Sequence, residues 1–208
     1  MIMTADLTHH DAQTLDRTLN AAARSFARHG LHGPDMASVA REVAGETGLD
    51  PADFRRAFPT RLDLACAIAL HSARRLVRDQ LADRGPGAPH KRLERLVRRH
   101  IDHCRHHRTE EDLRRTVLPT LRAVHPGRHR ELAELRQSYR DHLRTVVADG
   151  TAQGRFRVAD PGAAAGTVLE ALESVVNWYD PEDGLTAAEL GDVYTDLIVH
   201  HHLGAPRD

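Results

Sequence analysis

The chain has 208 residues, with 29 Lys and Arg against 30 Asp and Glu, so its formal net charge is −1 and a generally basic surface is excluded. Hydrophobic residues make up 40% and charged residues 28%, a balance that is typical of a globular chain and excludes intrinsic disorder. With only two cysteines, no leader pattern and no long apolar run, we expect a cytoplasmic protein that has neither a disulfide framework nor a membrane segment.

Apolar residues recur at helical spacing along the chain, and no stretch sustains the alternation that a half-buried strand requires. The sequence therefore predicts an all-α fold, with a head of three helices followed by a body of about six. Glycine and proline separate the helices, most clearly at Gly85–Pro89 and Pro181–Gly184. The expected helices cover approximately residues 11–29, 38–46, 51–58, 60–83, 90–107, 109–124, 128–149, 161–179 and 186 onward.

The segment from Ser38 to Leu64 predicts two short helices joined by a tight turn, which is the arrangement of a helix-turn-helix. Gly48 can adopt the positive φ that the turn requires. Phe54 and Phe58 lie one helical turn apart, so they would anchor the second short helix from behind. The side chains left on its outward face include those of Arg55 and Arg56.

Capping residues set the expected ends of several helices. Ser38 is expected to cap the first short helix, and Thr60 the helix that follows the motif, with Asp63 three residues on. Thr186 is placed to cap the last helix, with a glutamate at its third position. Gly150 and Gly154 are expected to end the long helix that begins near residue 128.

The segment resembles the DNA-binding motif of the TetR family of bacterial transcriptional regulators, most specifically in its end FPTRLDL. The resemblance implies a helix-turn-helix DNA-binding domain in residues 1–60 and a ligand-binding and dimerisation domain in residues 61–208. It also implies a homodimeric repressor that binds a palindromic operator in double-stranded DNA and is released by a small effector of unknown identity. Arg55 stands where the family usually has a tyrosine that contacts phosphate.

Arginine is the best candidate for sequence reading, because its guanidinium can pair in a two-pronged manner with guanine. We assign that role to Arg56, whereas Arg55 and Arg61 are better placed for phosphates, as are Ser38 and backbone amides at the helix starts. Residues 1–80 carry ten basic and ten acidic side chains, so the head has no excess positive charge. The expected DNA contacts are Ser38, Val39, Ala52, Asp53, Arg55, Arg56 and Arg61.

The resemblance also implies an effector pocket among the body helices, although each candidate lining residue would serve equally well as plain core. These candidates are Leu70, Ile101, Cys104, Leu118, Leu121, Tyr139, Leu143, Leu172 and Trp178. The last two helices are apolar over more than one face, which favours pairing with a second copy into a four-helix bundle. The alternative is that they close the core of a single chain. The expected interface residues are Val168, Leu169, Val175, Val176, Leu190, Tyr194, Leu197 and Ile198.

Other classes of function have weaker support in the sequence. No nucleophile elbow, phosphate loop or metalloprotease motif is present, so we expect no catalytic residues, no enzymatic activity and no cofactor. His100, His103, Cys104 and His107 share one helix, and a spacing of four can hold a transition metal, but surface histidines explain it as well. The remaining alternative is a helical ligand-sensing or metal-sensing module that lacks sequence-specific DNA binding.

Overall fold

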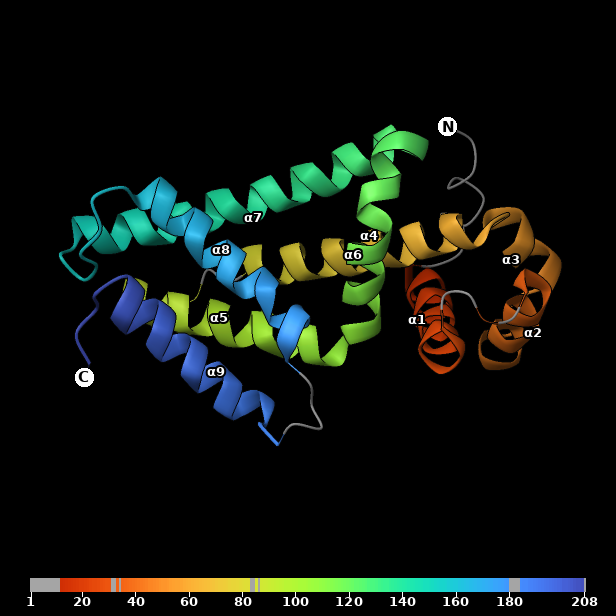
Figure 1. The fold of residues 1–208 in the computed structure, drawn as a ribbon, viewed down its shortest axis with the longest axis horizontal. Helices are drawn as coiled ribbons and strands as arrows, with labels where there is room; N and C mark the ends of the chain where they lie inside the picture. The colour runs from red at the N-terminus through yellow and green to blue at the C-terminus, as the bar shows by residue number, and fades with distance from the viewer. Residues whose placement is uncertain are drawn as a thin grey trace. The chain divides into compact units, whose positions relative to one another are not determined.

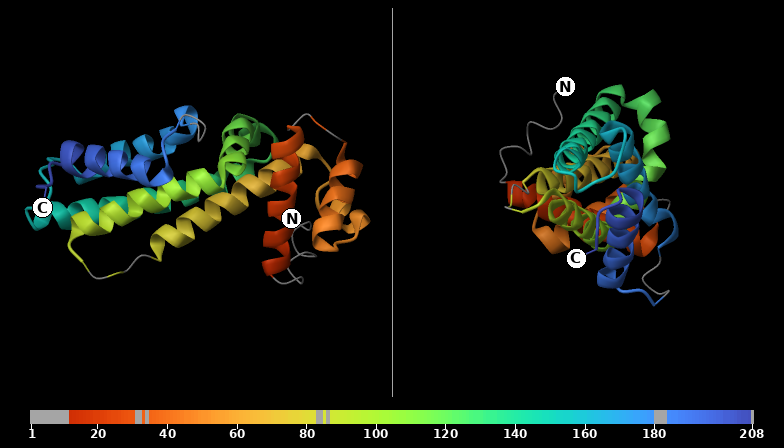
Figure 2. Two further views of the ribbon diagram at one scale, coloured as in Figure 1. Left: turned by 90° about the horizontal axis from the view of Figure 1, so that it is seen from below. Right: turned by 90° about the vertical axis from the view of Figure 1, so that its left-hand side faces the viewer.

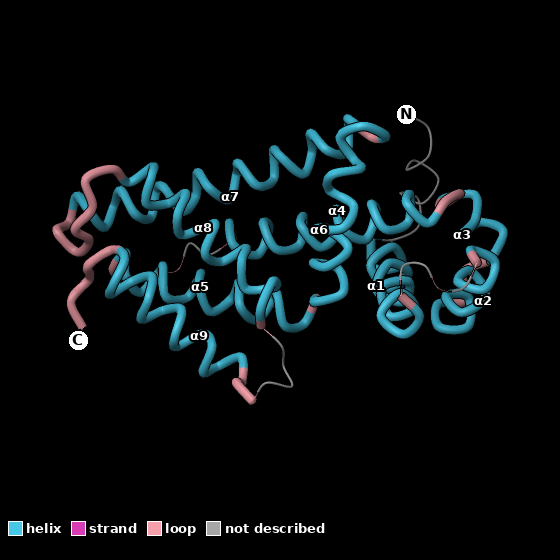
Figure 3. Tube along the Cα trace, viewed as in Figure 1, coloured by secondary structure: helices cyan, strands magenta, loops and turns pink. Residues whose placement is uncertain are grey.

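The computed structural model describes residues 12–30, 33, 35–82, 85, 87–179 and 184–207. Within these residues it contains nine α-helices and no strand, which confirms the all-α prediction (Figures 1 and 3). The expected break at Pro181–Gly184 lies outside the described residues except for its last glycine. Among the described residues, no helix combines the length and the apolar character needed to cross a bilayer.

The chain divides into two compact units, each built from two stretches of sequence. The first comprises Met1–Ala73 and Thr109–Arg130, and the second Arg74–Arg108 and Glu131–Asp208. This division differs from the boundary expected at residue 60, because the first half of α4 (Arg61–Leu81) and almost all of α6 (Arg108–Val124) belong to the first unit. A buried hydrogen bond of 3.2 Å from Ser72 Oγ to Glu111 Oε1 joins these two helices.

In the first unit, α1 (Ala12–His29) packs against α2 (Met36–Thr47), and α2 packs against α3 (Pro51–Ala57), as two further views show (Figure 2). Gly48 joins α2 to α3 in the left-handed region, with φ of 76°, so the predicted helix-turn-helix is present. Phe54 is completely buried and its ring lies 5.2 Å from that of Phe58. The two phenylalanines therefore hold α3 from its inner side, as the sequence predicts.

Of the three predicted helix-start caps, Thr60 and Thr186 are confirmed and Ser38 is not. Asp50 accepts a 2.6 Å hydrogen bond from the backbone of the first turn of α3, and the amide of Asp63 donates to Thr60 Oγ1 at 3.0 Å. The prediction that Ser38 caps α2 is wrong. Asp35 is the cap, because α2 begins at Met36 and the Asp35 carboxylate accepts from the amide of Ser38 at 2.7 Å.

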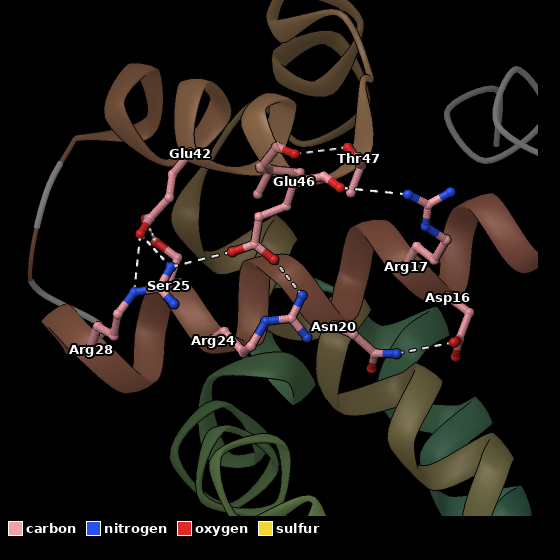
Figure 4. A network of polar contacts seen from close by, with 10 residues as sticks. Asp16, Arg17, Asn20, Arg24, Ser25, Arg28, Glu42, Glu46 and Thr47 are labelled. Carbon is pink, nitrogen blue, oxygen red and sulfur yellow. Dashed lines mark hydrogen bonds and ion pairs between the residues drawn. The ribbon is translucent and has the colours of Figure 1, made fainter.

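A network of ion pairs and hydrogen bonds fastens α1 to α2 (Figure 4). The Glu42 carboxylate accepts from the buried hydroxyl of Ser25 and from the guanidinium of Arg28. Glu46, one turn further along α2, pairs with Arg24 and Arg28. The hydrogen bond from Ser25, followed by the contacts with Arg28, holds the pKa of Glu42 below its ordinary value of 4.5.

This lowered pKa predicts how the stability of the head depends on pH. Because the pKa of Glu42 is lower in the folded chain than in the unfolded chain, its contribution is fully present above about pH 4.5. The contribution is lost as the pH falls through the native pKa. We therefore expect Glu42→Gln to lower the unfolding temperature at pH 7 and to flatten its decline in acid. A scan of unfolding temperature from pH 7 to pH 3 measures both effects. Glu134→Gln, at an exposed position on α7 (Pro126–Ala152), is the control. An identical profile for Glu42→Gln and wild type would contradict the assignment.

The second unit is built around α5 (Pro89–His106), which packs against α8 (Pro161–Trp178) and α9 (Ala187–Thr195). The last turns, Asp196–His202, continue α9 as a π-helix. Asp160 caps α8, and Thr186 forms the predicted cap of α9 as part of a capping box.

Of the two glycines expected to end α7 (Pro126–Ala152), Gly150 lies inside the helix, whereas Gly154, with φ of 68°, lies just after its last residue. The ring of Phe156 packs directly on Gly150, where an added Cβ would lie 2.1 Å from a ring carbon. The carbonyl of Gly150 accepts from the amides of Arg155 and Phe156 at 2.8 and 3.1 Å, and these bonds close the helix end. Gly150 therefore allows the close approach of Phe156, and its carbonyl takes part in closing the helix end.

Candidate nucleic-acid interface

The outward face of α3 carries two exposed arginines of different character. Nη1 of Arg56 lies 2.7 Å from Oδ1 of Asp53, three residues earlier, and these side chains are 72% and 50% exposed. Arg55 is exposed, and within the described residues no interaction of its side chain is recorded. The helix therefore presents one guanidinium that is held by a neighbouring carboxylate and one that is free to move to a phosphate.

Backbone amides at the helix starts were expected to hold phosphates, but carboxylates already occupy them. The Ser38 amide donates to Asp35, and this hydrogen bond lowers the pKa of the Asp35 carboxyl. Asp50 accepts in the same way at the start of α3. The hydroxyl of Ser38 accepts from Arg41 at 3.0 Å. The amides of Ser38 and Ala52 are therefore already bonded within the chain, which favours side chains for phosphate contacts.

Three further predicted contacts have different outcomes. Val39 is completely buried, so its assignment as a DNA contact is wrong; helical spacing places it on the core face with Val43. Ala52 is exposed on α3, as expected. Arg61 is half-buried and donates to the carbonyl oxygen of Gly33 at 2.7 Å, so it ties α4 to the segment before α2.

Arg41 is a candidate that the sequence analysis missed. Its side chain is exposed on α2 and reaches Ser38, three residues earlier, a pairing that helical spacing makes readable from the sequence. Acidic groups lie close to every arginine of this surface in the sequence: Asp35 precedes Arg41, while Asp50 and Asp53 precede Arg55 and Arg56. The face therefore offers specific donors without a strong positive field.

The residues expected to line an effector pocket separate into three groups. Five of them pack together in the core of the second unit, whereas Leu70 and Leu121 are buried in the first unit. Leu118 and Trp178 are exposed, so their assignment to a pocket lining is wrong for this structure. The five core residues are Ile101, Cys104, Tyr139, Leu143 and Leu172.

One polar pair lies inside this core. Nδ1 of His100 is 3.2 Å from the hydroxyl of Tyr139, both side chains are buried, and their rings stack with centroids 5.8 Å apart. Burial raises the pKa of the Tyr139 hydroxyl, so it remains protonated and able to donate. The pair is one of a few polar features of this interior, in which Gln80 and Thr195 are also buried.

The residues expected at a dimer interface are mostly occupied within the chain itself. Seven of the eight, all except Leu197, are buried in the core of the second unit, so they cannot present their side chains to another copy. Periodicity could not distinguish their own core from a partner's. Apolar side chains that remain exposed are Trp178 at the end of α8, Leu185 before α9, Val193 on α9 and Leu197 in the π-helical turns that follow.

Two other features of the described residues give only weak support for a binding site. The rings of His103 and His107 lie 4.7 Å apart, but no group of three or more metal-binding side chains is found among the described residues. A polar hollow of about 120 Å³ lies in the head, lined by Arg17, Asn20, Arg24, Glu46 and Thr47. It is smaller than the roughly 300–1,000 Å³ of typical small-molecule sites.

Comparison with known proteins adds a family match over more than half of the chain. The family model described as "Tetracyclin repressor-like, C-terminal domain" matches residues 86–201. No curated protein sequence matches the chain.

Solved structures of several regulators share the fold. A TetR family transcriptional regulator, PfmR from Thermus thermophilus, is 23% identical over 88% of this chain and 97% of its own, with a TM-score of 0.72. A tetR family regulatory protein from Rhodococcus RHA1 is 20% identical over 95% of this chain and 100% of its own, with a TM-score of 0.74. AibR, solved with isovaleryl coenzyme A and operator DNA, is 18% identical over 89% of this chain and 98% of its own, with a TM-score of 0.67.

Proposed function

The chain belongs to the TetR family of transcriptional regulators, and from that premise we propose that it binds an operator through α3 as a homodimer and is released by a small effector. The observation that carries the proposal is the outward pair of arginines on a helix that two buried phenylalanines hold rigidly. Arg56 would exchange Asp53 for a guanine edge, and Arg55 and Arg41 would take phosphates.

Selection of duplexes that the full-length protein retains from genomic fragments tests this function directly. Fluorescence anisotropy then gives the affinity for the selected sequence and for a shuffled one at several salt concentrations. We expect a palindromic consensus and a clear preference for it over the shuffled duplex. Equal affinity for both sequences at every salt concentration would reject operator recognition and leave a ligand-sensing module.

Dimerisation is proposed through the exposed apolar side chains of α8 and α9. Val193 and Leu197 lie four residues apart and are 53% and 51% exposed, and Trp178 is 50% exposed. Trp178 stacks on Tyr194 and donates its indole N–H to the tyrosine hydroxyl at 3.1 Å, so the aromatic surface is held in place. Apolar area of this kind, next to a buried core, is what a partner helix pair would cover.

We expect Val193→Asp/Leu197→Asp to convert the dimer to monomer, because each carboxylate would be buried against apolar side chains at the interface. Light scattering coupled to size-exclusion chromatography measures the mass. The emission of Trp178, the sole tryptophan, should shift to longer wavelength as it becomes more exposed to water. Val124→Asp, at an equally exposed valine of α6, should leave the mass unchanged. A dimer that survives the double substitution places the interface elsewhere.

The effector site is proposed in the core of the second unit, around His100 and Tyr139. This pair could orient one hydrogen-bonding group of a ligand while Ile101, Leu143 and Leu172 contact its apolar part. The test measures the unfolding temperature with apolar carboxylic acids and with a short-chain acyl coenzyme A, the ligand class of the AibR complex. A compound that binds the folded state raises this temperature.

A further inference from the structure

A buried carboxylate stands at the exit from the DNA-binding segment. Asp63 is in the first turn of α4, and its side chain is only 11% exposed. Its Oδ2 accepts from Thr60 Oγ1 at 2.6 Å, and its amide donates back to the same hydroxyl. These two bonds fix the corner between α3 and α4, which contains Phe58 and Pro59.

The other oxygen of this carboxylate is held by the junction of α6 and α7. Nη1 of Arg128 and Nε2 of His125 each lie 3.3 Å from Asp63 Oδ1. Nη1 of Arg128 also donates to the backbone carbonyl of Asp63 at 3.4 Å. A capping residue needs none of these contacts, because Thr60 already satisfies the helix start. The Asp63–Arg128 pair therefore does something besides capping.

The position of Arg128 at the start of α7 bears on the role of the pair. This residue lies in the first turn of α7, and the same continuous helix supplies Tyr139, Leu143 and Val146 to the core of the second unit. Within the first unit, Arg128 is bonded to the first turn of α4, which directly follows α3. A largely buried pair of this kind is costly to break by removing one partner, since the other charge is left buried.

We infer that the Asp63–Arg128 pair, assisted by His125, is the joint that positions the recognition helix, and that it sets the affinity for the operator. This inference rests on the proposed function. Arg128 acts here as a positioning residue, which reaches DNA only through the α3–α4 corner. Rigid presentation of α3 removes an ordering cost from binding, so a loosened joint should weaken specific binding.

The test compares full-length Arg128→Gln with Arg130→Gln, which removes the same charge two residues further along α7 from an exposed side chain without a recorded partner in the described residues. We expect Arg128→Gln to lower affinity for the selected operator about 10-fold, roughly 1.4 kcal/mol, with the dimer intact. Amide hydrogen exchange in residues 58–64 should accelerate. Arg130→Gln should change neither quantity, apart from the small loss that any removed positive charge causes. Arg128→Lys should restore part of both.

A double-mutant cycle with Asp63→Asn separates the joint from the helix start, because the asparagine oxygen can still accept the hydrogen bond from the Thr60 hydroxyl while the charge that Arg128 pairs with is removed. If the two residues act only through each other, the double variant should bind the operator with the same affinity as Arg128→Gln alone. Arg128→Gln behaving like Arg130→Gln in both affinity and exchange would overturn the inference. A wild-type protein that selects no operator would instead reject the proposed function and the claim about affinity, whereas the exchange rates would still show whether Arg128 holds the corner.

Discussion

Arg55→Ala/Arg56→Ala should lower the affinity for the selected operator by about 100-fold or more, because each lost arginine contact is worth roughly 1–3 kcal/mol. Both side chains are exposed on α3, so their removal should leave the fold and the dimer unchanged. Anisotropy with the selected duplex measures the loss. Arg105→Ala/Arg155→Ala, two exposed arginines of the second unit, is matched in charge and should retain nearly wild-type binding.

The single variants should differ in kind. Arg56→Ala should reduce the ratio of the affinity for the selected duplex to that for the shuffled duplex, because it removes a base contact. Arg55→Ala should weaken binding to both duplexes by the same factor. It should also reduce the slope of log affinity against log salt concentration by about one, as expected for the loss of one phosphate contact. Wild-type affinity in the double variant would show that α3 does not enter the groove with this face.

Phe54→Ala should destabilise the first unit by about 3–5 kcal/mol, the usual cost of removing a buried aromatic side chain. Phe54 is completely buried and its ring packs at a tilt against that of Phe58, so the cavity would lie directly behind the recognition helix. Because small domains have only about 5–15 kcal/mol of stability, we expect α3 to lose protection and DNA binding to fail at 37 °C.

Hydrogen exchange measured element by element checks this result. Amides of α1–α3 should exchange faster in Phe54→Ala, whereas those of α5 and α8, which belong to a separate core, should keep their protection. Phe54→Leu retains much of the volume and should lose less stability. Unchanged protection of α3 in Phe54→Ala would show that the helix does not depend on this anchor.

Much of the fold could be predicted from the sequence because its helix ends depend on local chemistry. Asp50, Asp160 and Thr186 each cap a helix within three residues of their own position, and such short-range bonds leave a readable pattern. The error at Ser38 has the same origin, since both Asp35 and Ser38 are good caps and the choice between them depends on where the preceding segment joins α2.

The candidate site was less predictable because its interactions join distant parts of the chain. Asp63 and Arg128 are 65 residues apart, and Arg61 reaches back to Gly33, so neither pairing leaves a local pattern. Helical periodicity shows that Val39, Val175 and Leu190 face something apolar. It cannot show whether that surface belongs to the same chain, to a second copy or to DNA, and for these three residues it is the same chain.

The pairing of Arg56 with Asp53 bears on how such a protein would find its target in a cell. A genome offers about 10⁶–10⁹ competing nonspecific sites, and an unpaired arginine side chain binds the phosphates of nearly all of them. Arg56 is already paired with a carboxylate, so exchanging that carboxylate for an arbitrary phosphate gains little binding free energy. Exchanging it for a correctly placed guanine gains more, because the guanine offers two acceptors. Few copies would then be sequestered on irrelevant sequence, so a small number of molecules could keep one promoter occupied.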